Sequence, residues 1–184
     1  MNRFQFPRWN ELPSLDLYMD QVITYLQSNL ESTYFSDEKF ITKAMINNYV
    51  KTSIVAPPVK KHYTKQHIAY FMVVTILKRC YSMSQISQLI EIHTHMKYSS
   101  VEQAYDLFIS LFEDSLNDLF SLNETEHAFI STNQEQKLME HVIQCIVYKI
   151  HTEYVLSKKG LPNFNGESPN SNGEHLWGVS HRKN

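Results

Sequence analysis

The stretch ITKAMINNYVKTSIVAPPVKKHYTKQHIAYFMVVTILKRC, residues 41–80, decides the fold. It predicts a short helix over residues 41–51, a break at Pro57-Pro58 and a second helix that starts at Thr64. Residues 68–77 of the second helix are apolar on every side, and a helix with that pattern lies inside a protein. The stretch therefore predicts two helices and a proline-containing connection organised around a buried core helix.

Helices are also predicted on both sides of this stretch. Apolar residues recur every three or four positions from Leu15 through Tyr18 to Leu30, which predicts an amphipathic helix beginning near Ser14. A short helix follows Ser84. Two longer amphipathic helices open at capping-box patterns, which are Ser100 with Gln103 and Thr132 with Glu135. The inward stripe predicted for the last helix is Leu138, Val142, Cys145, Ile146, Ile150 and Tyr154.

Glycine is confined to the C-terminal end of the chain. The 184 residues include four glycines, and none precedes Gly160. Phosphate-binding loops and dinucleotide-binding fingerprints need glycine where the backbone approaches a phosphate, so both are excluded before that residue. Tight β-hairpins also favour glycine. The composition therefore predicts an all-α fold.

Charge is divided unevenly along the chain. The net charge is −2, yet residues 40–90 contain seven basic residues and no acidic one. Residues 99–157 contain ten acidic residues against two lysines. A basic segment of this length favours an anionic partner. The alternative is that it docks on the acidic helices of the same molecule.

The sequence predicts a cytoplasmic protein. Cys80 and Cys145 lie in apolar runs and are predicted to be buried free thiols, as is usual in a reducing compartment. No signal peptide is evident near the N-terminus. The longest apolar run, residues 68–77, is about half the length of a membrane span.

No catalytic constellation is evident. His93 and His95 are two residues apart, and this spacing points them in different directions on a helix. Glu113, Asp114 and Asp118 fall on the polar side of an amphipathic helix and are predicted to be solvated. We therefore predict no enzyme activity, no cofactor and no metal site.

Residues 41–90 carry motifs of a known DNA-binding fold. The segment MINNYVKTSIVAPP, residues 45–58, resembles the recognition helix of MerR-type winged helix-turn-helix proteins and its exit into the wing. The segment KKHYTKQHI, residues 60–68, resembles the basic end of that wing, and CYSMSQISQLI, residues 80–90, resembles the end of the fold. Glycine is missing from the wing, so we expect Pro57-Pro58 to turn the chain. The resemblance implies an all-α, MerR-like (winged) helix-turn-helix core, with long C-terminal amphipathic helices forming a bundle or dimer interface.

A larger part of the chain resembles a narrower family. The segments PRWNELPSLDLYMDQVI, residues 7–23, and ITKAMINNYVKTSIVAPPVKKHYTKQHIAY, residues 41–70, are similar to the bacterial domain-of-unknown-function family 1836. This resemblance implies a small cytoplasmic bacterial protein with a DNA-binding half. We expect a helix-turn-helix DNA-binding-like domain at 1–96, a helical dimerisation or effector region at 97–157 and a disordered tail at 158–184.

These observations predict a transcriptional regulator that binds double-stranded DNA as a homodimer. A second possibility for the C-terminal helices is that they enclose a pocket for a small-molecule effector, which the sequence does not identify. Lys43, Asn47 and Lys51 share one helix face, and asparagine can bond the edge of adenine in the major groove. Lysines after the prolines would hold phosphates. The predicted DNA-binding residues are Thr42, Lys43, Asn47, Asn48, Tyr49, Lys51, Lys60, Lys61, His62, Tyr63 and Lys65. The alternative is a protein–protein interaction adaptor, in which the same scaffold binds an acidic protein.

Overall fold

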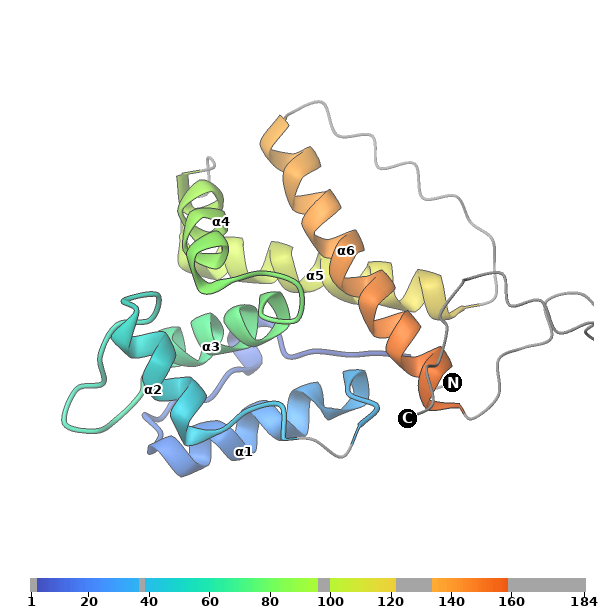
Figure 1. The fold of residues 1–184 in the computed structure, drawn as a ribbon. Coiled ribbons are helices and arrows are strands. Elements are labelled where there is room, and N and C mark those ends of the chain that lie inside the picture. Colours follow the sequence, from blue (N-terminus) through green and yellow to red (C-terminus); the bar gives the residue numbers. More distant parts are fainter. Residues whose placement is uncertain (1–2, 37–38, 96–99, 122–133, 159–184) are drawn as a thin grey trace, which may run out of the picture.

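A computed structural model of the chain describes residues 3–36, 39–95, 100–121 and 134–158. Within these ranges every regular element is a helix, which confirms the predicted all-α class (Figure 1). The α-helices are α1 (Met19–Leu30), α2 (Lys43–Lys51), α3 (Lys65–Leu77), α4 (Met83–His95), α5 (Val101–Phe120) and α6 (Gln134–Ser157). Two single-turn 3-10 helices, η1 (Trp9–Glu11) and η2 (Glu31–Thr33), flank α1.

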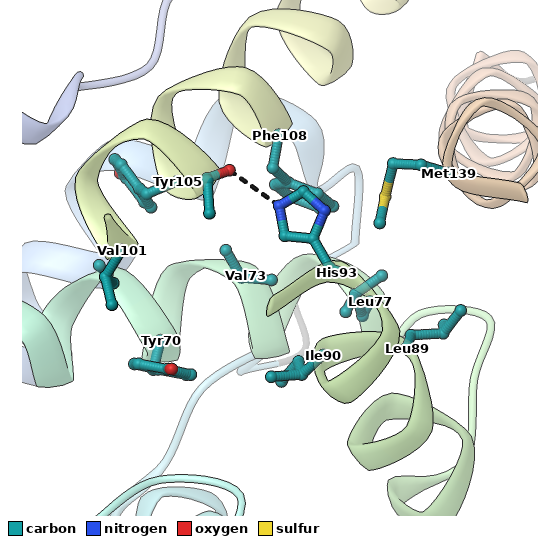
Figure 2. A pocket seen from close by; sticks show the side chains of 12 residues that line it. Tyr70, Val73, Leu77, Leu89, Ile90, His93, Val101, Tyr105, Phe108 and Met139 are labelled. Atoms are coloured by element: carbon teal, nitrogen blue, oxygen red, sulfur yellow. Dashed lines mark hydrogen bonds between the residues drawn. The ribbon is translucent and has the colours of Figure 1, made fainter. Parts of the chain in front are cut away.

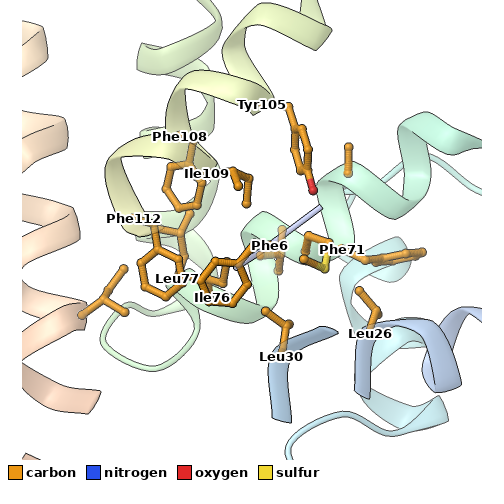
Figure 3. Packing of buried hydrophobic residues seen from close by; sticks show 14 of the residues in the cluster. Phe6, Leu26, Leu30, Phe71, Ile76, Leu77, Tyr105, Phe108, Ile109 and Phe112 are labelled. Carbon is orange, nitrogen blue, oxygen red and sulfur yellow. The ribbon is translucent and has the colours of Figure 1, made fainter. Parts of the chain in front are cut away.

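Helix α3 forms the centre of the fold. Nine of its 13 residues are buried, as the apolar pattern predicted. Helix α1 packs on one side of α3, and α5 packs on another (Figure 1). Figure 3 shows Phe71 and Ile76 of α3 meeting Leu30 of α1 and Phe112 of α5 in one hydrophobic cluster. Each such buried side chain stabilises the fold by roughly 1.5–3 kcal/mol relative to its exposed state.

The segment before α1 is an extended arm that packs on α5. Phe4 and Phe6 are buried, and the Phe6 amide donates to Glu113 Oε2 at 2.8 Å. The Arg8 guanidinium donates to Glu113 Oε1 at 2.9 Å. Glu113 is itself buried, so the prediction that it lies on a solvated face is wrong. The reason is that the arm covers this side of α5, a contact between residues about 100 positions apart.

Helix α6 packs on α5 through a face that differs in part from the predicted one. Val142, Ile146 and Ile150 are buried as predicted. Leu138 is 38% exposed and Cys145 is exposed, while Cys80 is half-buried. The prediction of two buried thiols is therefore wrong. The buried face is completed by residues next to the predicted stripe, which are Met139, Ile143 and Val147.

Helix boundaries agree with the predicted caps at most places. Thr42, Thr64 and Ser100 occupy the predicted N-cap positions. Helix α1 starts at Met19, later than predicted, and Leu15 is exposed. The predicted cap at Thr132 and the predicted tail beyond residue 158 lie outside the described residues. Among the helices that are described, none is long and apolar enough to cross a membrane.

Candidate nucleic-acid interface

Helix α2 presents a polar outer face because its other face is held in the core. Ile46 and Tyr49 are buried, whereas Lys43, Asn47 and Lys51 are exposed and lie four residues apart on one side. Asn48 is exposed beside them. At the start of the helix, Thr42 Oγ1 accepts a hydrogen bond from the Met45 amide at 3.3 Å, which satisfies one free amide.

The segment after the two prolines forms a tight turn that carries two lysines at its tip. The Val59 amide donates to the His62 carbonyl at 3.1 Å, and the His62 amide donates back to the Val59 carbonyl at 2.9 Å. Lys60 and Lys61 between them have φ values of 49° and 67°. Two successive positive φ angles are characteristic of a type I′ hairpin turn. The prediction that Pro57-Pro58 turns the chain is therefore wrong, because a two-residue hairpin turn forms without glycine.

The base of this turn is tied to the rest of the molecule on two sides. Tyr63 and Leu17 exchange backbone hydrogen bonds of 2.8 and 2.9 Å. Because Leu17 is held in this extended pairing, α1 begins only after it, at Met19. The Thr64 amide donates to His67 Nδ1 at 3.0 Å. Because Nδ1 accepts this hydrogen bond, Nε2 is the protonated nitrogen of the ring and donates to the Pro57 carbonyl at 3.4 Å. The turn is thus fixed relative to α1 and α3.

A groove joins the outer face of α2 to the turn. Its volume is about 510 Å³, and its lining includes Asn47 and Lys51 from α2, Lys61 from the turn, and Tyr18 and Asp20 beside the start of α1. Residues that are separated in sequence by the proline break are therefore brought to one surface. We call this surface the α2–turn groove.

The predicted lysines of the site differ in whether they already contact another residue. Among the described residues, Lys51, Lys60 and Lys61 form no ion pair. Lys43 pairs with Asp20 at 2.8 Å, although both side chains are largely exposed. Lys65 is half-buried, and its Nζ atom lies 5.7 Å from the centre of the Trp9 ring. Its side chain therefore packs on Trp9 and is not at the tip of the turn.

Two predicted contact residues are part of the core. Tyr49 is 1% exposed and Tyr63 is 3% exposed. Burial raises the pKa of Tyr49 to about 12 and also raises the pKa of Tyr63, so both hydroxyls stay neutral. The Tyr63 ring packs edge-on against Phe71, with 5.5 Å between ring centres. The Tyr49 side chain is therefore not available to a ligand on the surface, which corrects the prediction that it contacts DNA. Tyr63 is mostly covered, but its small exposed edge lines the α2–turn groove.

Tyr18 is a groove residue that the sequence pattern does not reveal. The periodicity predicts it within the first helix, but it precedes that helix and is 55% exposed. Its ring lies against the His62 ring, with 4.3 Å between centres. The His62 Nδ1 atom is 2.9 Å from the Lys60 carbonyl. The exposed Tyr18 ring thus packs on the turn through His62. Its position follows from the backbone bridge between the neighbouring residue Leu17 and Tyr63.

A separate apolar pocket lies between α3, α4 and α5. Figure 2 shows the His93 ring among apolar side chains, with its Nε2 atom 2.9 Å from the Ala104 carbonyl. The open space is about 60 Å³. Burial lowers the pKa of His93, which favours the neutral imidazole. Within the described part of the chain, no three His, Cys, Asp or Glu residues are grouped to hold a metal ion.

Comparison with known proteins identifies a family. The sequence model of a family described as "Domain of unknown function (DUF1836)" matches residues 7–108, a range that includes α2 and the turn. No curated protein and no solved structure matches the chain. Because the match covers more than half of the 184 residues, the chain belongs to the family of domain of unknown function 1836.

Proposed function

We propose that this protein is a transcriptional regulator that binds double-stranded DNA through the α2–turn groove. The observation that carries the proposal is the meeting of two exposed polar surfaces, the outer face of α2 and the lysine turn, on one groove. Lysines attract phosphates and fix the register of a protein on DNA, while asparagine side chains can distinguish base edges. The groove contains both kinds of residue.

The backbone of the turn gives independent support. A non-glycine residue with positive φ costs about 1–2 kcal/mol, and asparagine or glycine would reduce that cost at a type I′ turn. Lysine at both positions is therefore unfavourable for the turn itself. Strain of this kind is characteristic of functional sites, where the side chain is needed for binding.

The order of α2, turn, α3 and α4 supports a MerR-like winged helix-turn-helix arrangement for the DNA-binding part. We further propose that the protein acts as a homodimer in the cytoplasm. Leu138, Tyr148 and Leu156 are exposed apolar side chains on α6, and a second copy would cover such residues. Free cysteines at positions 80 and 145 are compatible with a reducing compartment.

The proposal is tested by selecting preferred sequences from a randomised DNA duplex library. The Asn47→Ala variant is expected to relax the preference at one base position, at a cost of about 1–3 kcal/mol for the preferred base. Gln134→Ala, an exposed amide on α6, is the matched control and should leave the preference unchanged. Failure of the wild-type protein to enrich any sequence at low salt overturns sequence-specific binding. Capture of one stoichiometric acidic protein without DNA then supports the adaptor alternative.

A further inference from the structure

The two cysteines of the chain lie next to each other where the connection between α3 and α4 reaches α6 (Figure 1). Cys80 lies in that connection, and Cys145 lies near the middle of α6. The Cys80 thiol donates to the Cys145 carbonyl at 3.8 Å, and the side chains of the two residues also interact directly. They are 65 positions apart in the sequence, so the fold brings them together. We call them the thiol pair.

A neighbouring ion pair holds the same two segments together. The side chain of Arg79 is 6% exposed, and it pairs with Glu153 of α6 at 2.6 Å. Glu153 also lies 3.4 Å from Lys149. Cys145, Lys149 and Glu153 are spaced four residues apart, so they share one side of α6. This side of α6 therefore lies along residues 79–80, and the thiol pair is part of a larger contact.

The two thiols differ in their access to solvent. Cys145 is exposed, whereas Cys80 is half-buried. Burial, followed by the hydrogen bond with the Cys145 side chain, raises the pKa of the Cys80 thiol to about 11. Because the thiolate is the nucleophile in disulfide exchange, Cys80 should react slowly with a reagent in solution. Cys145 is therefore the thiol that a small oxidant reaches first.

We propose that Cys80 and Cys145 form a reversible disulfide within one chain when the protein reacts with a low-molecular-weight disulfide. The Cys145 thiolate attacks one sulfur of the small disulfide, which gives a mixed disulfide at Cys145 and releases one small thiolate. Cys80 then loses its proton and attacks the Cys145 sulfur, which releases the second small thiolate. The two cysteines are thereby oxidised by two electrons, and the small disulfide is reduced to two thiols that take up the two protons.

The disulfide ties the connection before α4 to α6. Because the thiols are already in contact, we expect the oxidised chain to keep the same arrangement of helices. Disulfides of reducing compartments are usually transient and redox-sensing, and an exposed sulfur such as that of Cys145 is open to reduction by small thiols. The pair belongs to a single chain, so the inference stands whether or not the protein binds DNA or forms a homodimer.

The test is oxidation of the reduced full chain by excess oxidised glutathione. Free thiols are then blocked, and the products are analysed by denaturing electrophoresis without reductant and by intact mass spectrometry. We expect a monomer that has lost two hydrogen atoms and carries no glutathione. The rate should be the same at protein concentrations that differ by about tenfold, because the closing step is intramolecular. Dithiothreitol should restore both thiols.

Three variants separate the roles of the two thiols. Cys80→Ser should stop at a glutathione adduct on Cys145, because the second attack is lost. Cys145→Ser should react at least about tenfold more slowly than Cys80→Ser, since its remaining thiol is half-buried. The matched control His141→Cys/Cys145→Ser moves the exposed thiol by about one turn of α6. It should form the disulfide at least about tenfold more slowly than the wild type, because disulfide geometry is specific.

Four results would overturn the proposal. Oxidation could join two chains through Cys145, it could leave glutathione on both cysteines without closing the disulfide, or it could leave both thiols free. In the fourth, His141→Cys/Cys145→Ser forms the intramolecular disulfide as fast as the wild type.

Discussion

At the scale of single residues, Lys60 and Lys61 adopt backbone conformations that lysine disfavours. Their φ values of 49° and 67° place both in the left-handed region, which asparagine and glycine occupy at lower cost. If the side chains are retained for binding, stability and binding should respond in opposite directions to their replacement. This opposition separates a functional turn from a merely tolerated one.

The double substitution Lys60→Asn and Lys61→Gly is expected to stabilise the protein by about 1 kcal/mol, or roughly 2–4 °C in melting temperature. The same variant should bind DNA at least about tenfold more weakly, because two phosphate contacts are lost. Thermal unfolding and fluorescence polarisation measure the two effects. A variant that is less stable than the wild type contradicts the assignment of a strained type I′ turn.

His93 links a single residue to the pH dependence of stability. Burial holds its pKa below the ordinary value of about 6.5, so the unfolded chain binds a proton more readily than the folded chain. Its contribution to stability is therefore complete above about pH 6.5 and is lost as the pH falls toward the folded pKa. Urea unfolding at several pH values should show the wild type losing stability relative to His93→Gln below about pH 6.5. A constant difference between the two proteins contradicts this account.

At the scale of elements, α5 holds the N-terminal arm through the buried carboxylate of Glu113. Its oxygens accept from the Phe6 amide and the Arg8 guanidinium. Glu113→Ala would leave both donors unpaired, and we expect it to lower the free energy of unfolding by roughly 3 kcal/mol. Asp114→Ala, at the exposed neighbouring position, should change it by less than about 0.5 kcal/mol. Equal effects in urea unfolding contradict the role assigned to the arm.

Elements defined by local signals could be predicted from the sequence, and their contacts could not. The caps at Thr42 and Ser100 and the apolar run of α3 depend on neighbouring residues, and the structure confirms them. The arm on Glu113 and the outward position of Cys145 depend on which face meets a distant helix. Periodicity shows that a helix has an apolar side, but it does not reveal what an extended segment covers.

In the candidate site, too, the features set by local sequence could be predicted, and the contacts between distant segments could not. Lys43, Asn47 and Lys51 lie on one exposed face, as their spacing predicted. The bridge between Leu17 and Tyr63 brings Tyr18 to the groove, and neither residue carries a local signal for this pairing. Tyr49 and Tyr63 show why the residue type alone misleads, since an aromatic residue near lysines can equally belong to the core.

At the scale of the whole molecule, the basic segment is only partly neutralised within the fold. Arg79 pairs with Glu153 of α6, which is the intramolecular docking that the sequence left open. Lys43 pairs with Asp20 of α1. Lys51, Lys60 and Lys61 have no acidic partner among the described residues and are exposed. Of the five basic residues of this segment that form no ion pair with a described residue, Lys51, Lys60 and Lys61 therefore lie on α2 and the turn, whereas Lys65 and Lys78 lie elsewhere.

Recognition of DNA by the α2–turn groove is tested by the salt dependence of DNA binding for the wild type and for Lys60→Glu/Lys61→Glu. Fluorescence polarisation should give a steep, linear fall of log affinity with log salt for the wild type, with a slope of about −0.9 for each neutralised phosphate. The double variant should lose about two phosphate contacts per protomer. Lys137→Glu/Lys158→Glu makes the same change of charge in the first turn of α6 and directly after its end, away from the groove, and should retain the wild-type slope. Equal losses in the two double variants, or no wild-type binding at about 50 mM salt, would contradict recognition of DNA by this groove.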